Sequence, residues 1–246
     1  MRSLLIAPAD DRRLAGALLS GADAIVVDLA GAQPSDQAAA RAIVARFLEG
    51  ARGRGEGLRL IVRVNPLDSG ETDSDLDASM AHAPDAILLP RSFGGASIQQ
   101  LSAKIAVREA DLALAHGATR IIAVVDTAQA LLAMGSYRGA SARLIGVGWS
   151  AEALSADIGA ETDRDPSGGY TGPCRLARDL TLLAATSAGA EAIDAAFADP
   201  RDEEGLRAEA LAARRLGFAG KMAIDAAQAG VINAIFPSRT TTLRQS

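Results

Sequence analysis

Charged side chains recur in this sequence directly after short aliphatic runs, at the points where strands would end. When parallel strands end at one face of a fold, the residues at those ends are the ones placed for catalysis. Some of these residues are arginines, which can hold a carboxylate through two parallel hydrogen bonds. The others are carboxylates, which could hold Mg²⁺ together with water and substrate oxygens. In chain order the set is Asp28, Arg63, Arg91, Asp126, Asp194 and Asp225.

This set of charges allows two interpretations. In the first, Arg63 and Arg91 only pair with neighbouring aspartates, because a charge removed from water is costly without a partner. In the second, an arginine binds a substrate carboxylate and the aspartates opposite it bind a metal ion. We favour the second interpretation, since charges at the mouth of a barrel usually serve a ligand.

The elements that must position these groups alternate regularly along the chain. Eight apolar runs are each followed by a helical pattern, with no linker-like change in composition between them. The predicted strands cover 3–7, 24–28, 58–64, 86–90, 121–126, 144–148, 192–197 and 220–225. We therefore predict an α/β protein with a single (β/α)8 TIM-barrel domain over residues 1–236 and a polar tail over 237–246. An open parallel sheet is the alternative, but no glycine-rich dinucleotide motif follows the first strand.

The composition of the 246-residue chain excludes several classes of protein. A hydrophobic content of 49% is too high for a disordered chain, and one cysteine, Cys174, cannot form an internal disulfide. The formal net charge of −5 lacks the basic footprint of a nucleic-acid-binding protein. No apolar run approaches the ~18 residues that a membrane helix needs. We expect a cytoplasmic protein that binds neither nucleic acid nor a membrane.

Several segments, in a fixed order along nearly the whole chain, carry a resemblance to a known family. They cover residues 2–8, 21–29, 63–66, 87–90, 148–159, 170–178, 201–207 and 217–224. In these segments the sequence resembles the HpcH/HpaI aldolase/citrate lyase family, whose members include citrate lyase beta subunit-like acyl-CoA lyases. Each segment is weak alone, but their common order is specific.

The resemblance implies a Mg²⁺-dependent barrel that forms a homo-oligomer. Such an enzyme cleaves or forms the carbon–carbon bond of a 3-hydroxyacyl thioester, for example citryl-CoA or malyl-CoA, and Mg²⁺ stabilises an enolate-like charge. Arg63 stands in the Arg-Val-Asn-Pro motif whose arginine binds a substrate carboxylate in the family. Asp126 stands where the family has a metal-binding glutamate. The expected ligands are a small carboxylate and an acyl-CoA.

The sequence departs from the family at the positions that carry its chemistry. Ala30 and Gly31 replace two acidic residues, and Ala153 replaces the aspartate that is the second metal ligand of the family. Asp126 is one methylene shorter than the family glutamate, so its oxygens lie ~1.5 Å further back. Asp225 stands where the family has histidine.

These observations together assign roles to a few residues. We predict that Arg63 and Asp126 are catalytic and that both, with Asp28, bind the substrate. Asp126 is the candidate metal ligand, with Asp28 or Asp225 as a replacement for the ligand lost at Ala153. The alternative is a catalytically reduced member of the family that binds an acyl-CoA, a dicarboxylate or a partner subunit without turnover.

Overall fold

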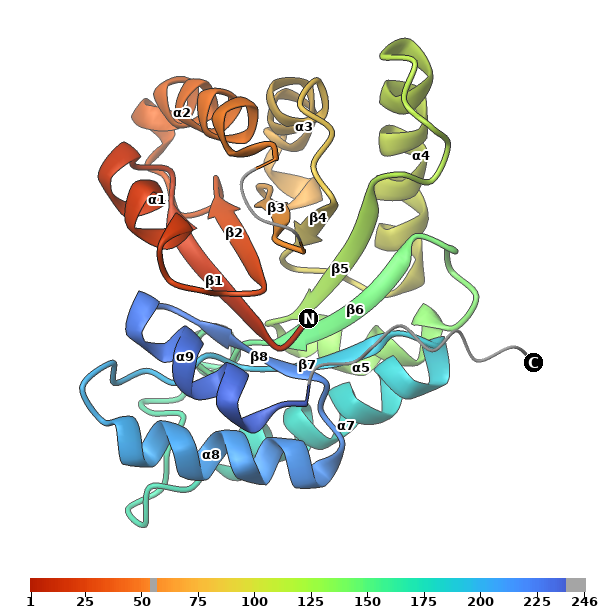
Figure 1. Ribbon diagram of the computed structural model, residues 1–246. Helices are drawn as coiled ribbons and strands as arrows, with labels where there is room; N and C mark the ends of the chain where they lie inside the picture. Colours follow the sequence, from red (N-terminus) through yellow and green to blue (C-terminus); the bar gives the residue numbers. More distant parts are fainter. Residues whose placement is uncertain (54–56, 238–246) are drawn as a thin grey trace.

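The strands of this protein close into a barrel, as the computed structural model shows for residues 1–53 and 57–237 (Figure 1). Each strand is parallel to the next in chain order, and β8 pairs back onto β1. The strands are β1 (Ser3–Pro8), β2 (Ala24–Asp28), β3 (Arg59–Arg63), β4 (Ala86–Leu89), β5 (Arg120–Val125), β6 (Leu144–Trp149), β7 (Glu191–Asp194) and β8 (Gly220–Ala223). The predicted TIM barrel is thus confirmed, and the open-sheet alternative is wrong.

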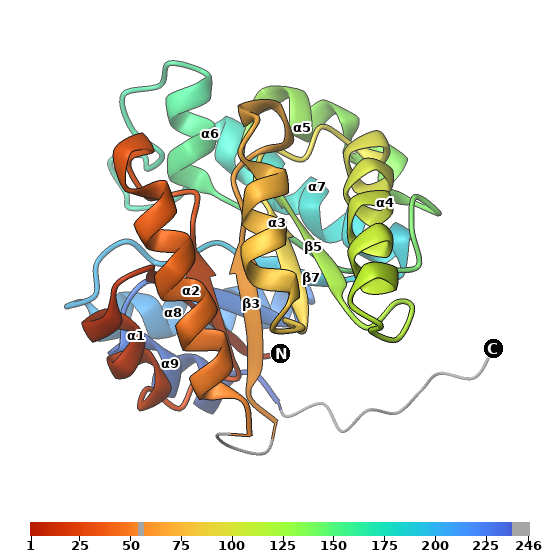
Figure 2. The same ribbon diagram turned by 90° about the horizontal axis from the view of Figure 1, so that it is seen from above.

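Helices surround the barrel, and each strand is followed by one or two of them (Figure 2). They are α1 (Asp11–Leu18), α2 (Gln37–Ala51), α3 (Thr72–Met80), α4 (Gly95–Asp111), α5 (Ala128–Ala133), α6 (Ala151–Asp157), α7 (Gly172–Ala188), α8 (Glu203–Leu216) and α9 (Ala226–Ile235). Short 3-10 turns lie at η1 (Pro34–Asp36), η2 (Leu67–Ser69) and η3 (Met134–Tyr137). Across the described ranges, no helix combines the length and the apolar character needed to cross a membrane. The predicted polar tail lies outside the described residues, except for Pro237.

The strands separate two apolar cores, because successive side chains on a strand point to opposite faces. The inner core fills the barrel, and the outer core lies between the strands and the helices. Leu4, Val26, Ile61, Ile122 and Ile193 belong to the inner core, and each is buried. The inner core is tightly packed: a Cβ at Gly146 would lie 3.0 Å from Ile193, and one at Gly148 would overlap Met222.

Two strands end at least two residues earlier than the sequence predicts. β7 ends at Asp194 rather than residue 197, and β8 ends at Ala223 rather than residue 225. Asp225 begins α9 instead, where its side chain accepts a hydrogen bond from the backbone N–H of Ala227 at 2.9 Å and Gln228 completes a capping box. A residue that satisfies the free N–H groups of a helix terminus lies outside the sheet.

Candidate active site

The carboxyl end of the barrel brings together Asp28, Arg63 and Asp126. Asp28 and Arg63 are paired across β2 and β3, and Asp126 directly follows β5. Each lies two residues beyond an inner-core residue of its own strand, so all three side chains point toward the barrel axis. The structure therefore gathers three of the six strand-end residues singled out in the sequence at one mouth of the barrel.

Arg63 is held from one side only. Its Nη1 donates to Asp28 Oδ2 at 3.1 Å, and its side chain is 30% exposed. For the rest of the guanidinium, no acceptor is present within residues 1–53 and 57–237. The pairing of Arg63 with an aspartate is thus real, but it leaves most of the N–H groups free to hold a carboxylate.

Gly31 helps to place Asp28 against this arginine. Its backbone N–H donates to Asp28 Oδ1 at 3.1 Å. A Cβ at position 31 would lie 2.8 Å from Asp28 Oδ2, so a side chain there would displace the carboxylate. The glycine that replaces an acidic residue of the family therefore permits the present Asp28–Arg63 contact. Beside it a cavity of about 350 Å³ opens between the strand ends and α2, lined in part by Pro8, Asp28, Gly31 and Ile43.

Asp126 is a buried carboxylate with little opposing charge. Its residue is 5% exposed, and both carboxylate oxygens accept from the backbone N–H of Arg91, at 2.9 and 3.1 Å. Burial raises the pKa of Asp126 to about 6, although the Arg91 N–H and the charge of Arg63 act in the opposite direction. Asp126 is therefore placed to accept a proton or a cation.

Arg91 reaches Asp126 through its backbone rather than its side chain. Its φ is 48°, a left-handed conformation that costs energy for a residue with a Cβ and is found disproportionately at functional sites. The guanidinium lies instead 3.5 Å from Asp68 and over the ring of Phe93. The Arg91 side chain thus pairs with an aspartate, Asp68, that is not one of the strand-end aspartates singled out in the sequence.

The donor set for a metal ion at this mouth is small. Nowhere in the described part of the chain do three or more His, Cys, Asp or Glu side chains form a metal-binding group. Ala153 lies on α6, where Glu152 is exposed, and Asp225 caps α9. The donors that point into the mouth are Asp126 and Asp28, and Asp28 is already paired with Arg63, so Mg²⁺ fits only where substrate oxygens and water complete the coordination shell. Asp225 caps α9 rather than ending β8, so its predicted position at a strand end is wrong, while its role as a replacement ligand stays a prediction.

Asp194 does not belong to the mouth either, which corrects the sequence interpretation. Its neighbour Ile193 points into the barrel, so Asp194 points outward, and it is fully buried. Lys221 Nζ lies 2.9 Å from Asp194 Oδ2, and Trp149 Nε1 donates to Oδ1 at 3.0 Å. Arg178 donates to both oxygens, at 3.0 and 2.9 Å. Both carboxylate oxygens of Asp194 are therefore hydrogen-bonded to partners outside the barrel interior, and its role is structural.

These contacts extend into a buried ionic cluster, which we define as Asp194, Lys221, Glu209, Arg178 and Arg164. Glu209 lies 2.7 Å from Lys221 Nζ and 2.7 Å from Arg164. The cluster was missed in the sequence because its members come from separate elements. The alternation of each strand was the available signal: Ile193 and Met222 face inward, so the adjacent Asp194 and Lys221 face outward.

The cluster also fixes the long segment between α6 and α7. Arg164 stacks on the ring of Tyr170 at 3.7 Å, and the Tyr170 hydroxyl donates to Glu209 at 3.0 Å. The same ring meets Trp149 edge-on, with centroids 5.0 Å apart. Trp149 is fully buried and belongs to the outer core.

A closed barrel with an arginine and two carboxylates at its carboxyl end defines a (β/α)8 protein of the enzymatic type. The family model of the HpcH/HpaI aldolase/citrate lyase proteins matches residues 2–226. The chain belongs to this family, which is a family of lyases.

Curated relatives and solved structures agree with this assignment. The chain is 30% identical to the citrate lyase subunit beta of Leuconostoc mesenteroides over 96% of its own length and 76% of that protein's length. It is 34% identical to a (3S)-malyl-CoA thioesterase of Cereibacter sphaeroides over the same shares. The citrate lyase beta subunit of M. tuberculosis complexed with oxaloacetate and magnesium superposes with a TM-score of 0.79 at 28% identity, covering 95% of this chain and 96% of that one.

A second structure from that organism includes a thioester-forming cofactor. The protein CitE of Mycobacterium tuberculosis in complex with magnesium, acetoacetate and coenzyme A superposes with a TM-score of 0.80 at 28% identity. The alignment covers 97% of this chain and 82% of that one. The resemblance to the family predicted from the sequence is thereby confirmed, as is the barrel.

Proposed function

We propose that this protein is a carbon–carbon lyase that cleaves or forms a 3-hydroxyacyl thioester, such as citryl-CoA or malyl-CoA. The proposal rests on one observation above all. Arg63 is held by Asp28 on one side while the rest of its guanidinium is open, and buried Asp126 lies within its electrostatic reach. That arrangement suits a keto acid, which presents a carboxylate next to a carbonyl oxygen.

Each residue then has a distinct role. Arg63 binds the substrate carboxylate, and Asp28 holds the guanidinium in place for it. Asp126 would hold Mg²⁺ together with oxygens of the substrate and water, in keeping with relatives whose structures contain magnesium with oxaloacetate or acetoacetate. When bound, Mg²⁺ would supply positive charge to the keto-acid oxygens and so stabilise the negative charge that the substrate hydroxyl oxygen carries once its proton is lost. In cleavage the substrate hydroxyl loses its proton, its oxygen forms the carbonyl of the keto acid as the carbon–carbon bond breaks, and the electron pair of that bond leaves with the thioester as an enolate. The enolate then takes up a proton at carbon.

Calorimetry on the full chain tests the carboxylate site. Oxaloacetate or pyruvate is titrated with Mg²⁺ present, with and without acetyl-CoA. Arg63→Gln should weaken keto-acid binding about tenfold or more, since a hydrogen bond to a charged group is lost. Arg215→Gln, a charge change on the exposed end of α8, is the matched control and should leave binding unchanged. Keto-acid binding that survives Arg63→Gln would refute the assigned site.

The metal role has a test of its own. Asp126→Glu combined with Ala153→Asp restores the two family carboxylates, and it should raise the affinity for Mg²⁺ about tenfold or more. An unchanged affinity would show that Mg²⁺ is held elsewhere. If neither the native chain nor this variant binds Mg²⁺ with the keto acid, the lyase proposal fails.

The second candidate is a catalytically reduced member of the family that binds an acyl-CoA, a dicarboxylate or a partner subunit. The observation that favours it is Ala153: among the described residues, Asp28 and Asp126 are the carboxylates that point into the mouth, and Asp28 is already paired with Arg63. Keto-acid binding that depends on Arg63 but not on Mg²⁺, without turnover of either thioester, is its expected signature. A homo-oligomeric state and a cytoplasmic location, both expected from the sequence, stay predictions.

A further inference from the structure

The amino end of the barrel carries charged side chains. β3, β5 and β7 begin with Arg59, Arg120 and Glu191. Two residues further along the same strands lie the inner-core residues Ile61, Ile122 and Ile193. Because residues two apart share a face of the strand, the three charged side chains also point toward the axis. The side chain of Arg59 is 58% exposed, so these charges lie at the open amino-end rim of the barrel, below its aliphatic interior.

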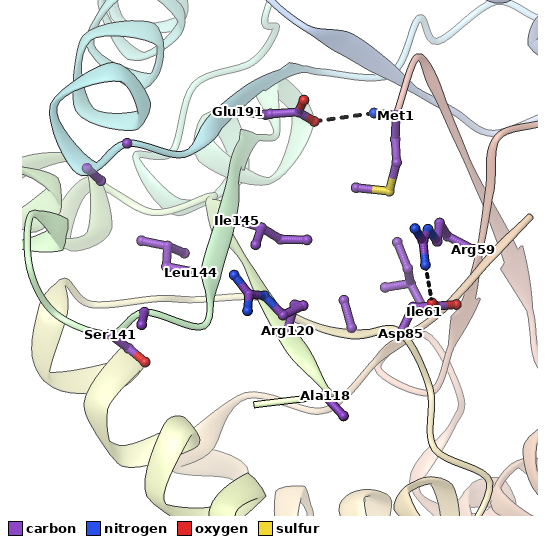
Figure 3. A pocket seen from close by; sticks show the side chains of 14 residues that line it. Met1, Arg59, Ile61, Asp85, Ala118, Arg120, Ser141, Leu144, Ile145 and Glu191 are labelled. Carbon is purple, nitrogen blue, oxygen red and sulfur yellow. Dashed lines mark hydrogen bonds and ion pairs between the residues drawn. The ribbon is translucent and has the colours of Figure 1, made fainter. Parts of the chain in front are cut away.

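These residues border a cavity of about 730 Å³, which we call the floor pocket. Its volume lies in the ~300–1,000 Å³ range of small-molecule sites. Its lining is mixed, with apolar side chains of Met1, Ile61, Leu144 and Ile145 beside the charged ones (Figure 3). Ala86, Ala118, Ala142 and Gly189 also line it, and these small residues leave the space open.

The charges of the floor pocket do not all cancel. Arg59 lies 2.7 Å from Asp85, whose other oxygen accepts from the backbone N–H of Leu60 at 2.8 Å. Glu191 lies 3.3 Å from the amino group of Met1. For the guanidinium of Arg120, by contrast, no hydrogen bond or ion pair is formed with any residue of the ranges 1–53 and 57–237. Figure 3 shows Arg120 amid the lining, with the Arg59–Asp85 pair on one side and Ser141 and Leu144 on the other.

We propose that the floor pocket is a second ligand site, which binds a small organic anion with a short apolar body. The carboxylate or phosphate group of the ligand pairs with Arg120, and its apolar body lies against Ile61, Leu144 and Ile145. The inner core, with Ile122 and Ile193 among its members, separates this pocket from the barrel mouth. The site is therefore independent of the one that contains Arg63.

The test uses hexanoate on the full chain, with two probes that each lack one half of the proposed chemistry. Hexanamide has the apolar body without the charge, and inorganic phosphate has the charge without the body. The readout is the ¹³C-methyl resonance of Met1, which lines the pocket, against those of Met80 and Met134 in the outer core. Hexanoate should shift the Met1 resonance and bind about tenfold more tightly than either other probe.

Variants locate the binding. Arg120→Gln should weaken hexanoate binding about tenfold, whereas Arg12→Gln, an exposed arginine of α1, should not change it. Ala118→Leu, which fills the pocket from an exposed position, should abolish hexanoate binding without changing any charge.

Phosphate binding equal to that of hexanoate would overturn the apolar part of the proposal. No Met1 shift with hexanoate, or a shift that Arg120→Gln and Ala118→Leu both leave intact, would overturn the site itself. Because Arg63→Gln should leave this binding unchanged, failure here is distinct from failure of the lyase proposal.

Discussion

Asp126 and Asp194 are both buried aspartates at the carboxyl ends of barrel strands, yet their electrostatics are opposite. Burial raises the pKa of Asp126 to about 6, because few opposing charges reach it inside the mouth. Burial alone would raise the pKa of Asp194 too, but the charges of Lys221 and Arg178 hold it below its ordinary value. The strand face on which a carboxylate lies therefore decides whether it is poised for a ligand or committed to the fold.

The largest expected effect comes from making the same substitution at both positions. Asp194→Asn leaves Arg178 and Lys221 without their shared carboxylate, so we expect a loss of about 3–5 kcal/mol in the free energy of unfolding. Asp126→Asn removes a poorly compensated charge and should cost less than about 1 kcal/mol or increase stability. Urea unfolding at neutral pH compares the two, and equal losses would contradict the distinction.

The next effect is a pH dependence of stability, measured on metal-free protein in EDTA. The pKa of Asp126 in the folded protein is about 6, above the ordinary aspartate value of 3.8. The contribution of protonated Asp126 to the free energy of unfolding is thus fully present below pH 3.8 and is lost as the pH rises through 6. The stability advantage of Asp126→Asn over the native chain should therefore grow between pH 4 and pH 7, by up to about 3 kcal/mol. A constant difference in stability across this range would show that Asp126 has an ordinary aspartate pKa in the folded protein.

The smallest expected effect measures how much the Tyr170 hydroxyl, at the edge of the ionic cluster, adds to the stability of the fold. Tyr170→Phe keeps the ring that contacts Arg164 and Trp149 but removes the hydrogen bond to Glu209. We expect a loss of about 1 kcal/mol, visible as a small decrease in thermal midpoint. A loss as large as that of Asp194→Asn would mean that the hydroxyl, rather than the ion pairs, holds the cluster together.

The sequence predicts the parts of this molecule that depend on local pattern. Aliphatic runs located the strands, and the residues after them identified Asp28, Arg63 and Asp126 as mouth residues. Asp194 was misplaced because the alternation along the four residues of β7 turns it outward only once Ile193 is known to face the barrel interior. Partners such as Arg178 and Glu209 come from α7 and α8, and no local spacing in the sequence indicates that these helices meet the same strand end.

The ionic cluster also limits the order in which parts of the chain can fold during synthesis on the ribosome. The Tyr170 hydroxyl bonds to Glu209, which is made 39 residues later, and Lys221 follows later still. β1 likewise has no partner on one side until β8 exists. The segment between α6 and α7 can take its final place only after α8 has emerged. Until α8 and β8 have been made, the nascent chain therefore carries a segment without its final contacts and a first strand without one of its two partners.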